Sequence, residues 1–296
     1  MLVNLKEIMD LAERNLYAVG SFNTPNLESL EAVIQAAEEL KLPVIIQFAQ
    51  CHEPWIPLEL IGPIMVEAAK KAKVPVCVHL DHGETLEYLQ SALDMGFTSI
   101  MYDGSVLPYE ENLENTKKAV AMAAKTGASV EAELGSMGRR ESGDVAEGAD
   151  TIDAAATGAD DETKIYTDPV QAGIFVKETG IDALACSFGT THGIYLTEPK
   201  LDFGVVEGVR AQTDNIPVVM HGGSGVSKED YRKAIKAGVR KINYFTYMDK
   251  SGGNAAAEYV KSVQTGAPLF FSSVMMAARE AMKENVKEAM TMFALR

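Results

Sequence analysis

The chain has 296 residues, of which 47% are hydrophobic and 23% are charged, and its formal net charge at pH 7 is -15. A chain of this length fits one large domain or two ordinary ones, and it can bury a full core. The negative charge argues against nucleic acid and anionic membrane surfaces as partners. An anionic substrate would therefore have to be held by local amides, a cation or a metal.

Targeting and redox signals are sparse. No apolar stretch approaches the roughly 18 residues that a membrane helix needs, and the first ten residues lack the basic and then apolar pattern of a secretory signal. We therefore predict a cytoplasmic protein. Cys51, Cys77 and Cys186 form no CxxC pair, so we expect reduced, structural thiols.

Short β-rich runs alternate with amphipathic segments along the chain. Apolar residues at three- and four-residue steps predict helices between the runs, as over 26–41 and 58–73. Strands that are joined through helices pair in parallel. The eight runs are 16–22, 43–48, 74–79, 98–102, 128–133, 182–186, 216–221 and 240–244.

Eight strand–helix units favour a closed (β/α)8 TIM barrel, an α/β fold, over an open doubly wound sheet. Since no Pro/Gly/Ser-rich linker divides the chain, we predict a single domain over 1–296. The long interval at about 135–167, after the fifth strand, is predicted to form a flap. The pattern loosens through 251–253, and a last amphipathic helix is predicted over about 270–295, with its methionines in core or interface packing.

The stretch His-Leu-Asp-His-Gly at 79–83 follows the third predicted strand. Side chains on a strand alternate faces, so the neighbours Asp81 and His82 can serve one site only if the strand ends between them. Gly83 would let the backbone turn there. The stretch is therefore a candidate metal and acid/base corner, or else a hydrogen-bonded pair at a strand end.

Three histidines are each followed directly by glycine: His82, His192 and His221. In a parallel barrel they would lie at the carboxyl ends of strands three, six and seven, where side chains of different strands converge. Three neutral imidazoles and an open position make a zinc site of the catalytic type, which acts on a carbonyl as a Lewis acid. The alternative is three unrelated strand-end histidines. His79 is expected to support the site or the core, and His52 has no clear role.

The stretch His-Gly-Gly-Ser-Gly at 221–225 is followed one strand later by Asn-Tyr-Phe-Thr at 243–246. Glycines let backbone N–H groups approach an anion, and the ends of strands seven and eight are the usual phosphate site of this barrel. We therefore predict that a small phosphate binds here. By itself such a glycine-rich loop is also compatible with a simple turn.

Carboxylates accompany the histidines. Asp103 ends the fourth strand, and Glu131 and Glu133 lie two residues apart on the fifth, so both glutamates share one face. Burying both carboxylates costs free energy unless a nearby cation compensates their charge. Lys241 would be the candidate for Schiff-base chemistry, but the histidines favour a metal.

Seven motifs, taken together and in this order, resemble the class II, zinc-dependent ketose-bisphosphate aldolases. The resemblance is closest to the branch with fructose- and tagatose-bisphosphate aldolases. The motifs are HLDHG at 79–83, YDGS at 102–105, VEAELG at 130–135, YTDP at 166–169, FGTTHGIY at 188–195, HGGSG at 221–225 and Lys-Ile-Asn at 241–243.

This resemblance implies reversible aldol cleavage of a ketose (bis)phosphate to dihydroxyacetone phosphate and an aldehyde. His82, His192 and His221 would bind zinc, with Glu133 as a ligand when the metal shifts position. Asp81 would exchange a proton with the substrate C4 oxygen.

The resemblance also implies roles for the flap and for the phosphate segment. Glu141, at the position of the family's flap glutamate, would move the proton at the carbon that becomes nucleophilic. A monovalent cation, Na⁺ or K⁺, near the phosphate and a homodimer or homotetramer are also implied. The dihydroxyacetone phosphate half would be held by Gly193, Gly222, Gly223, Ser224, Asn243, Tyr244, Phe245 and Thr246, with Asn243 also stabilising the ene-diolate.

Two departures from the family pattern leave the substrate open. Arg139 and Arg140 precede Glu141 where the family carries a glycine pair, and Tyr244 and Phe245 replace smaller residues. Either arginine could bind a distal phosphate or sulfonate of the aldehyde, or both could face solvent. The candidate substrates are fructose 1,6-bisphosphate, tagatose bisphosphate, and deoxy or sulfo sugar phosphates. A zinc hydrolase or a non-catalytic binding protein on the same barrel are the competing interpretations.

Overall fold

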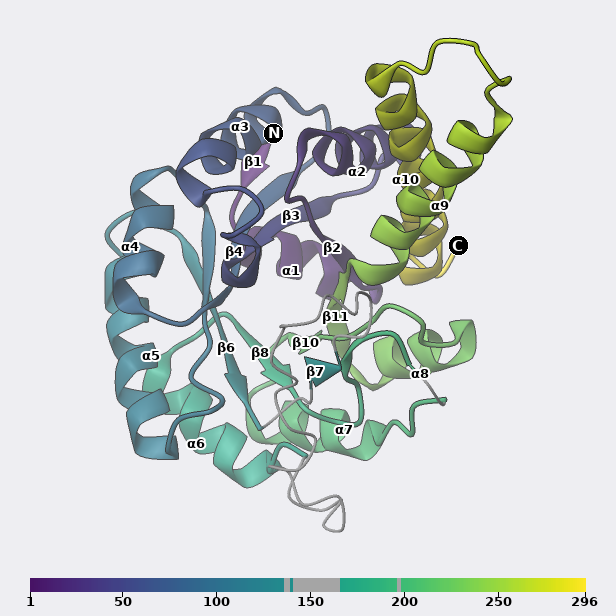
Figure 1. The fold of residues 1–296 in the computed structure, drawn as a ribbon. Helices are drawn as coiled ribbons and strands as arrows, with labels where there is room; N and C mark the ends of the chain where they lie inside the picture. Colours follow the sequence, from purple (N-terminus) through teal and green to yellow (C-terminus); the bar gives the residue numbers. More distant parts are fainter. Residues whose placement is uncertain (136–138, 141–165, 196–197) are drawn as a thin grey trace.

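A computed structural model describes residues 1–135, 139–140, 166–195 and 198–296 of the chain. Within them, eight parallel strands close into a barrel, and β11 pairs with β2 to complete the ring (Figure 1). The predicted (β/α)8 barrel is thereby confirmed. In the order of the ring the strands are β2 (Val19–Asn23), β3 (Val44–Ala49), β4 (Val76–Gly83), β5 (Ser99–Tyr102), β6 (Ser129–Leu134), β8 (Ala183–Cys186), β10 (Val218–Met220) and β11 (Val239–Tyr244).

Helices surround the barrel, and several of them begin at a side chain that accepts a hydrogen bond from one of their first amides. Asn26 accepts a hydrogen bond from Ser29 N–H at the start of α2, and Asp168 does the same for Val170 N–H at the start of α6. None of the helices in the described ranges is long and apolar enough to cross a membrane. The outer helices are α2 (Leu27–Leu40), α3 (Leu58–Lys71), α4 (Leu86–Asp94), α5 (Tyr109–Ala123), α6 (Pro169–Thr179), α7 (Phe203–Gln212), α8 (Lys228–Ala237), α9 (Thr246–Ser262) and α10 (Phe271–Phe293).

The amino-terminal end of the barrel is closed by α1 (Leu5–Asn15), while β1 (Leu2–Val3) pairs with β4. The apolar face of α1 packs on the side chains that start the strands, which removes apolar surface from water. Access to the interior is therefore left to the carboxyl ends of the strands. The apolar plug that α1 forms with the starts of the strands consists of Leu5, Ile8, Met9, Ala12, Val19, Ile45, Cys77, Ala183, Ala185 and Val219.

A polar layer lies above this apolar plug inside the barrel. Its side chains are paired with one another: Ser21 donates to Gln47, and His79 Nδ1 lies 2.8 Å from Ser99 Oγ. Buried polar groups are tolerated when they are hydrogen-bonded, and such networks fix a unique arrangement. The layer comprises Ser21, Gln47, His79, Ser99, Glu131 and Lys241, all fully buried.

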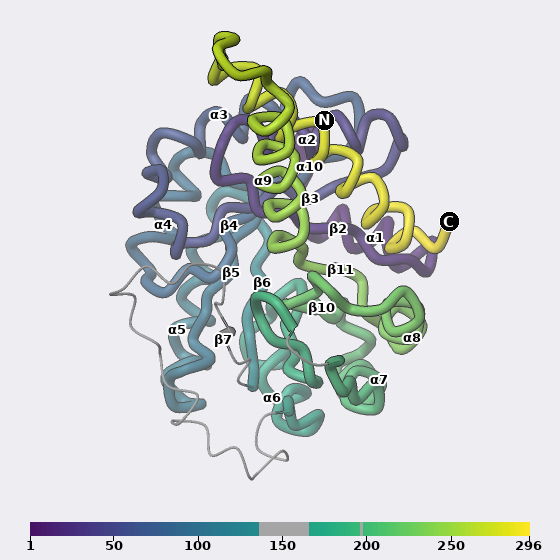
Figure 2. Tube along the Cα trace, turned by 45° about the vertical axis from the view of Figure 1, so that its right-hand side comes forward, coloured from purple at the N-terminus to yellow at the C-terminus, as the bar shows by residue number. Residues whose placement is uncertain are grey.

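The predicted loosening at 251–253 is wrong, because α9 continues through Gly252 and Gly253. A Cβ on Gly252 would lie only 2.9 Å from Met282 Cγ, so glycine permits the close approach of α9 and α10. The two helices form a hairpin whose connected end extends beyond the barrel, while α10 also packs on α2 (Figure 2). The predicted last helix is confirmed as α10.

Candidate active site

The structure brings His82, His192 and His221 together at the carboxyl end of the barrel. Their ring centroids are 4.6 Å apart for His82 and His221, 5.0 Å for His82 and His192, and 5.7 Å for His192 and His221. Each ring offers one nitrogen, and these three nitrogens lie within 4.8 Å of one another. The arrangement can hold one metal ion. His192 was expected at a strand end, but it lies on the separate short strand β9 (His192–Gly193), six residues after β8 ends at Cys186.

His82 reaches the cluster through an unusual backbone conformation. Strand β4 runs on to Gly83, and His82 itself adopts a φ of 46° where the ladder to β5 shifts register. The expected turn therefore occurs at His82, which lets Asp81 and His82 face one site. Gly83 is needed for a different reason: a Cβ there would lie 2.4 Å from Leu89 Cδ1 and 2.9 Å from Met101 O.

His82 is fixed by a carboxylate behind it. Its Nδ1 lies 2.7 Å from Asp103 Oδ2, which leaves Nε2 as the ring atom that could bind a metal. Burial alone would lower the pKa of His82, but Asp81 and Asp103 raise that pKa to about 9. A metal ion at this site would have to displace the proton.

Two glutamates of β6 flank the His221 ring. Glu131 Oε1 lies 2.9 Å from Nε2, and Glu133 Oε2 lies 3.5 Å from Nδ1. Burial, together with Asp103, raises the pKa of Glu133 to about 8. Burial would also raise the pKa of Glu131, but Lys241, His221 and His79 together outweigh this effect, and the pKa falls to about 2. The sequence predicted a cation beside these two buried glutamates. For Glu131, that cation is the ammonium group of Lys241.

A second group that could hold a metal shares His82 with the first. His82, Asp103 and Glu133 also offer ligand atoms within 4.8 Å of one another. Glu133 is thus close enough to His82 for the alternate-ligand role that the family resemblance implies.

Asp81 is held by three amide side chains. Asn243 Nδ2 donates to Oδ1 at 3.0 Å, and Oδ2 accepts from Gln47 Nε2 at 2.9 Å and from Asn23 Nδ2 at 3.4 Å. Burial would raise the pKa of Asp81, but His82, His221 and Lys241 hold that pKa well below its usual range. Asp81 is therefore an oriented, ionised carboxylate. Sequence reasoning missed Asn23 and Gln47.

The predicted phosphate segment is fastened by its own contacts. Gly222 has a φ of 62°, and a Cβ there would lie 2.3 Å from Thr191 O. Gly223 N–H donates to Asn243 O at 3.1 Å, and Phe245 N–H donates to Ser224 Oγ at 3.2 Å. Those two amides are thus already engaged, while α9 begins immediately afterwards and points its first N–H groups toward this end of the barrel.

Tyr195 contributes a contact that was not predicted. Its hydroxyl donates to Gly222 O at 2.8 Å and accepts from Thr191 N–H at 3.0 Å. It therefore ties the stretch around His192 to the glycine loop. Gly193 is the second residue of β9 and pairs with Arg140 of β7 (Arg139–Arg140). Glu141 lies outside the described residues, as does most of the predicted flap.

Tyr244 does not turn its side chain toward the predicted phosphate site. Its ring is buried 5.9 Å from that of Phe22 and 6.0 Å from that of Phe293, between the barrel and α10. Asn243 faces the interior, and the next residue on a strand points to the opposite face. The side chain of Tyr244 therefore packs in the outer core, which corrects its expected role for side-chain contacts.

An aromatic cluster lies beside the site after β3. His52, in the short 3-10 helix η1 (Gln50–His52), stacks on Trp55 with ring centroids 4.7 Å apart and lies 5.1 Å from the Phe245 ring. Burial lowers the pKa of His52 to about 4. His52 thus acts as a neutral packing residue that joins the loops after β3 and β11.

The pKa of His52 predicts an effect on acid stability. The unfolded state takes up this proton near pH 6.5 and the folded state only near pH 4, so stability is lost as the pH falls between these values. The full loss would be about 3 kcal/mol. We expect His52→Phe to flatten the dependence of the free energy of unfolding on pH from 6.5 to 4, as measured by urea titration of Trp55 fluorescence. Equal slopes in the parent and the variant would contradict this assignment.

A barrel that gathers three histidines and an ionised aspartate at its carboxyl end defines a candidate metal-dependent enzyme. The family model described as fructose-bisphosphate aldolase class-II matches residues 3–296. The chain therefore belongs to the class II fructose-bisphosphate aldolase family, and it is a carbon–carbon lyase. The resemblance inferred from the motifs is confirmed.

Individual relatives agree with this assignment. Proteins named fructose-bisphosphate aldolase from Staphylococcus aureus and Staphylococcus epidermidis are each 38% identical over 291 residues, which covers 97% of this chain and 95% of theirs. The crystal structure of the YdjI aldolase from Escherichia coli aligns with a TM-score of 0.83 and 36% identity, and it covers 99% of this chain and 97% of that one.

Proposed function

We propose that the protein catalyses the reversible retro-aldol cleavage of a ketose bisphosphate to dihydroxyacetone phosphate and an aldehyde. Fructose 1,6-bisphosphate or a close analogue is the proposed substrate, in line with the names of its relatives. The proposal rests on one observation above all: Asp81, Asn243 and the three histidines lie together at one end of the barrel.

Zinc is the metal that the donors fit. His82 and His221 each have one ring nitrogen on a carboxylate, so each can present the other to an ion, as ligating histidines commonly do. Three histidines without a fourth permanent ligand suit a catalytic zinc site. When bound, zinc would supply a Lewis acid that polarises the substrate carbonyl. A monovalent cation near the phosphate and a cytoplasmic location remain predictions from the sequence.

Residues of the chain would supply the proton transfer, the stabilisation of negative charge and the phosphate binding. Asp81, ionised and held by three amides, would accept the proton of the C4 hydroxyl as the bond between C3 and C4 breaks. Asn243 would orient Asp81 and donate a hydrogen bond to the ene-diolate oxygen that gains negative charge. The loop Gly222 to Ser224 and the first turn of α9 from Thr246 would hold the phosphate.

The test is a cleavage screen with metal analysis. Purified protein should release dihydroxyacetone phosphate from at least one of fructose bisphosphate, tagatose bisphosphate and C6-deoxy or C6-sulfo ketose phosphates, and EDTA should abolish the release. A zinc-free protein that is inactive on every compound, before and after added zinc, would overturn the proposal.

Arg139 and Arg140 are proposed to bind the distal anion of the aldehyde half. The support is that β7 pairs with β9, with Arg139 opposite His192, so this part of the chain reaches the site. The same screen with both arginines replaced by alanine should show raised KM values for substrates with a distal phosphate or sulfonate. Unchanged turnover of every compound would rule this role out.

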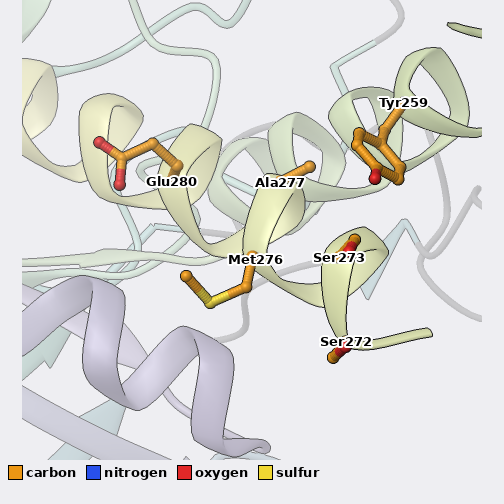
Figure 3. A pocket seen from close by; sticks show the side chains of 6 residues that line it. All are labelled: Tyr259, Ser272, Ser273, Met276, Ala277 and Glu280. Atoms are coloured by element: carbon orange, nitrogen blue, oxygen red, sulfur yellow. The ribbon is translucent and has the colours of Figure 1, made fainter. Parts of the chain in front are cut away.

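We propose that a second copy of the chain covers the α9–α10 hairpin. Phe270 and Phe271 are 62% and 76% exposed at the start of α10, and Met276, 53% exposed, lines a groove with Tyr259 and Ala277 (Figure 3). Large apolar side chains gathered on one surface are typical of an interface between proteins. This supports the homodimer or homotetramer that the family resemblance implies.

Replacing Phe270 and Phe271 by serine should therefore shift the protein toward monomer in light-scattering chromatography. Both side chains are exposed, so we expect the free energy of unfolding of the separated subunit to change by no more than about 0.5 kcal/mol. A protein that is monomeric before substitution, at micromolar concentration, would contradict the proposed surface.

A further inference from the structure

A buried ion pair lies directly beneath the candidate metal site. Lys241 Nζ is 2.8 Å from Glu131 Oε2, and both side chains are fully buried in the polar layer of the barrel. The other oxygen of the carboxylate, Oε1, is 2.9 Å from His221 Nε2. The two oxygens of Glu131 therefore serve two partners, the lysine from β11 and the histidine that follows β10.

This arrangement distinguishes the two nitrogens of His221. An ionised carboxylate only accepts hydrogen bonds, so the contact with Glu131 places a proton on Nε2. The lone pair of the neutral ring is then on Nδ1, which lies 3.5 Å from Glu133 Oε2. Glu133 belongs to the group with His82 and Asp103 that could hold a metal, so Nδ1 is the nitrogen on the side of the site.

Lys241 balances the charge of the Glu131 carboxylate and fixes its orientation. The ammonium holds Oε2, and His79 Nε2, 3.5 Å from the same oxygen, closes the other side. His79 is itself anchored through Nδ1 to Ser99 Oγ at 2.8 Å. With Oε2 occupied in this way, Oε1 is the oxygen left for His221.

We propose that Lys241 is a positioning residue for the metal: through Glu131 it fixes the orientation and tautomer of His221, so that Nδ1 faces the ion. The inference rests on the proposed zinc site at the three histidines. It assigns Lys241 a place in metal binding and no covalent role. Its ammonium is buried against Glu131, and Lys241 lies two residues before Asn243 on the same strand, β11.

The experiment measures zinc affinity in metal-free protein by competition with a chelator, for the parent and for Lys241→Met. We expect the variant to bind zinc roughly 10- to 100-fold more weakly, the usual loss when a partner of a ligating histidine is removed. In parallel, ¹⁵N spectra of labelled histidines should show one Nε2-protonated ring for His221 in the parent and a mixture of tautomers in Lys241→Met.

Two further variants keep the test decisive. Arg240→Met is the matched control, because Arg240 is the preceding residue of β11, and its buried side chain forms an ion pair with the half-buried Glu13, 2.7 Å from Nε to Oε2, away from the histidines. It should bind zinc like the parent. If Lys241→Met does not fold, the paired change Glu131→Gln with Lys241→Met removes both buried charges, and it should show the same weakened zinc binding.

The outcomes separate the two proposals. A parent protein that binds no zinc would overturn the proposed function and this inference with it. A parent that binds zinc, beside a folded Lys241→Met or paired variant with unchanged zinc affinity and an unchanged His221 tautomer, would overturn the inference alone. Lys241 and Glu131 would then be a structural ion pair only.

Discussion

Replacement of Asp81 by asparagine should lower kcat for ketose bisphosphate cleavage by roughly 10²- to 10⁴-fold, the usual contribution of a positioned acid or base. Asparagine has nearly the same shape, but its amide cannot accept the proton of the C4 hydroxyl. Its NH₂ group would also face the amide donors of Asn243 or Gln47. Steady-state release of dihydroxyacetone phosphate measures the effect.

Zinc content provides the internal check on this prediction, since Asp81→Asn leaves the three histidines in place. Asp182→Asn is the matched control: this aspartate precedes β8 at the other end of the barrel and accepts from Val130 N–H at 2.9 Å. The control should retain kcat. An Asp81→Asn protein within about threefold of the parent, with normal zinc content, would remove Asp81 from the proton transfer.

His82→Gln is expected to lose both zinc and cleavage activity. The substitution removes one ring from the cluster and leaves Asp103 without its 2.7 Å partner. A Lewis acid contributes several kcal/mol to a step of this kind, which corresponds to roughly a 10³-fold or larger loss of kcat. Metal analysis of the purified variant and an activity assay with added zinc measure the two effects.

His52→Phe serves as the comparison for this substitution, because His52 is a buried histidine that stacks on Trp55 outside the cluster. It should keep a full complement of zinc. A His82→Gln protein that retains one tightly bound zinc per chain would show that the ion sits elsewhere.

The barrel could be predicted from sequence because its signals are local. Strand and helix periods repeat eight times, and a histidine followed by glycine recurs at 82, 192 and 221. Parallel topology alone places the ends of such strands on one rim. The same logic placed Asp81 and Asn243 at this rim, and the structure joins them by a hydrogen bond.

Other features depend on neighbours that are distant in sequence. Gln47 interrupts an apolar run, which is a signal for a buried polar partner, but only the register of β3 against β4 identifies that partner as Asp81. The pairing of Glu131 with Lys241 likewise joins strands that do not adjoin in the ring. The left-handed conformation of His82 has no sequence signal of its own.

The prediction that the helical pattern loosens at 251–253 was wrong because it relied on the low helix propensity of glycine, which packing overrides here. Gly252 and Gly253 are poor helix formers, yet α9 runs through them because the contact with Met282 of α10 leaves no room for a larger side chain at 252. Tyr244 could have been placed correctly, since it follows the inward-facing Asn243 on the same strand and so must point outward.

The most direct test of the central claim is anomalous diffraction at the zinc absorption edge from crystals of the purified protein. We predict one zinc peak per chain, bound by His82 Nε2, His221 Nδ1 and a nitrogen of His192. Zinc-loaded crystals whose anomalous peak lies away from these three rings, or that show no peak at all, would contradict it.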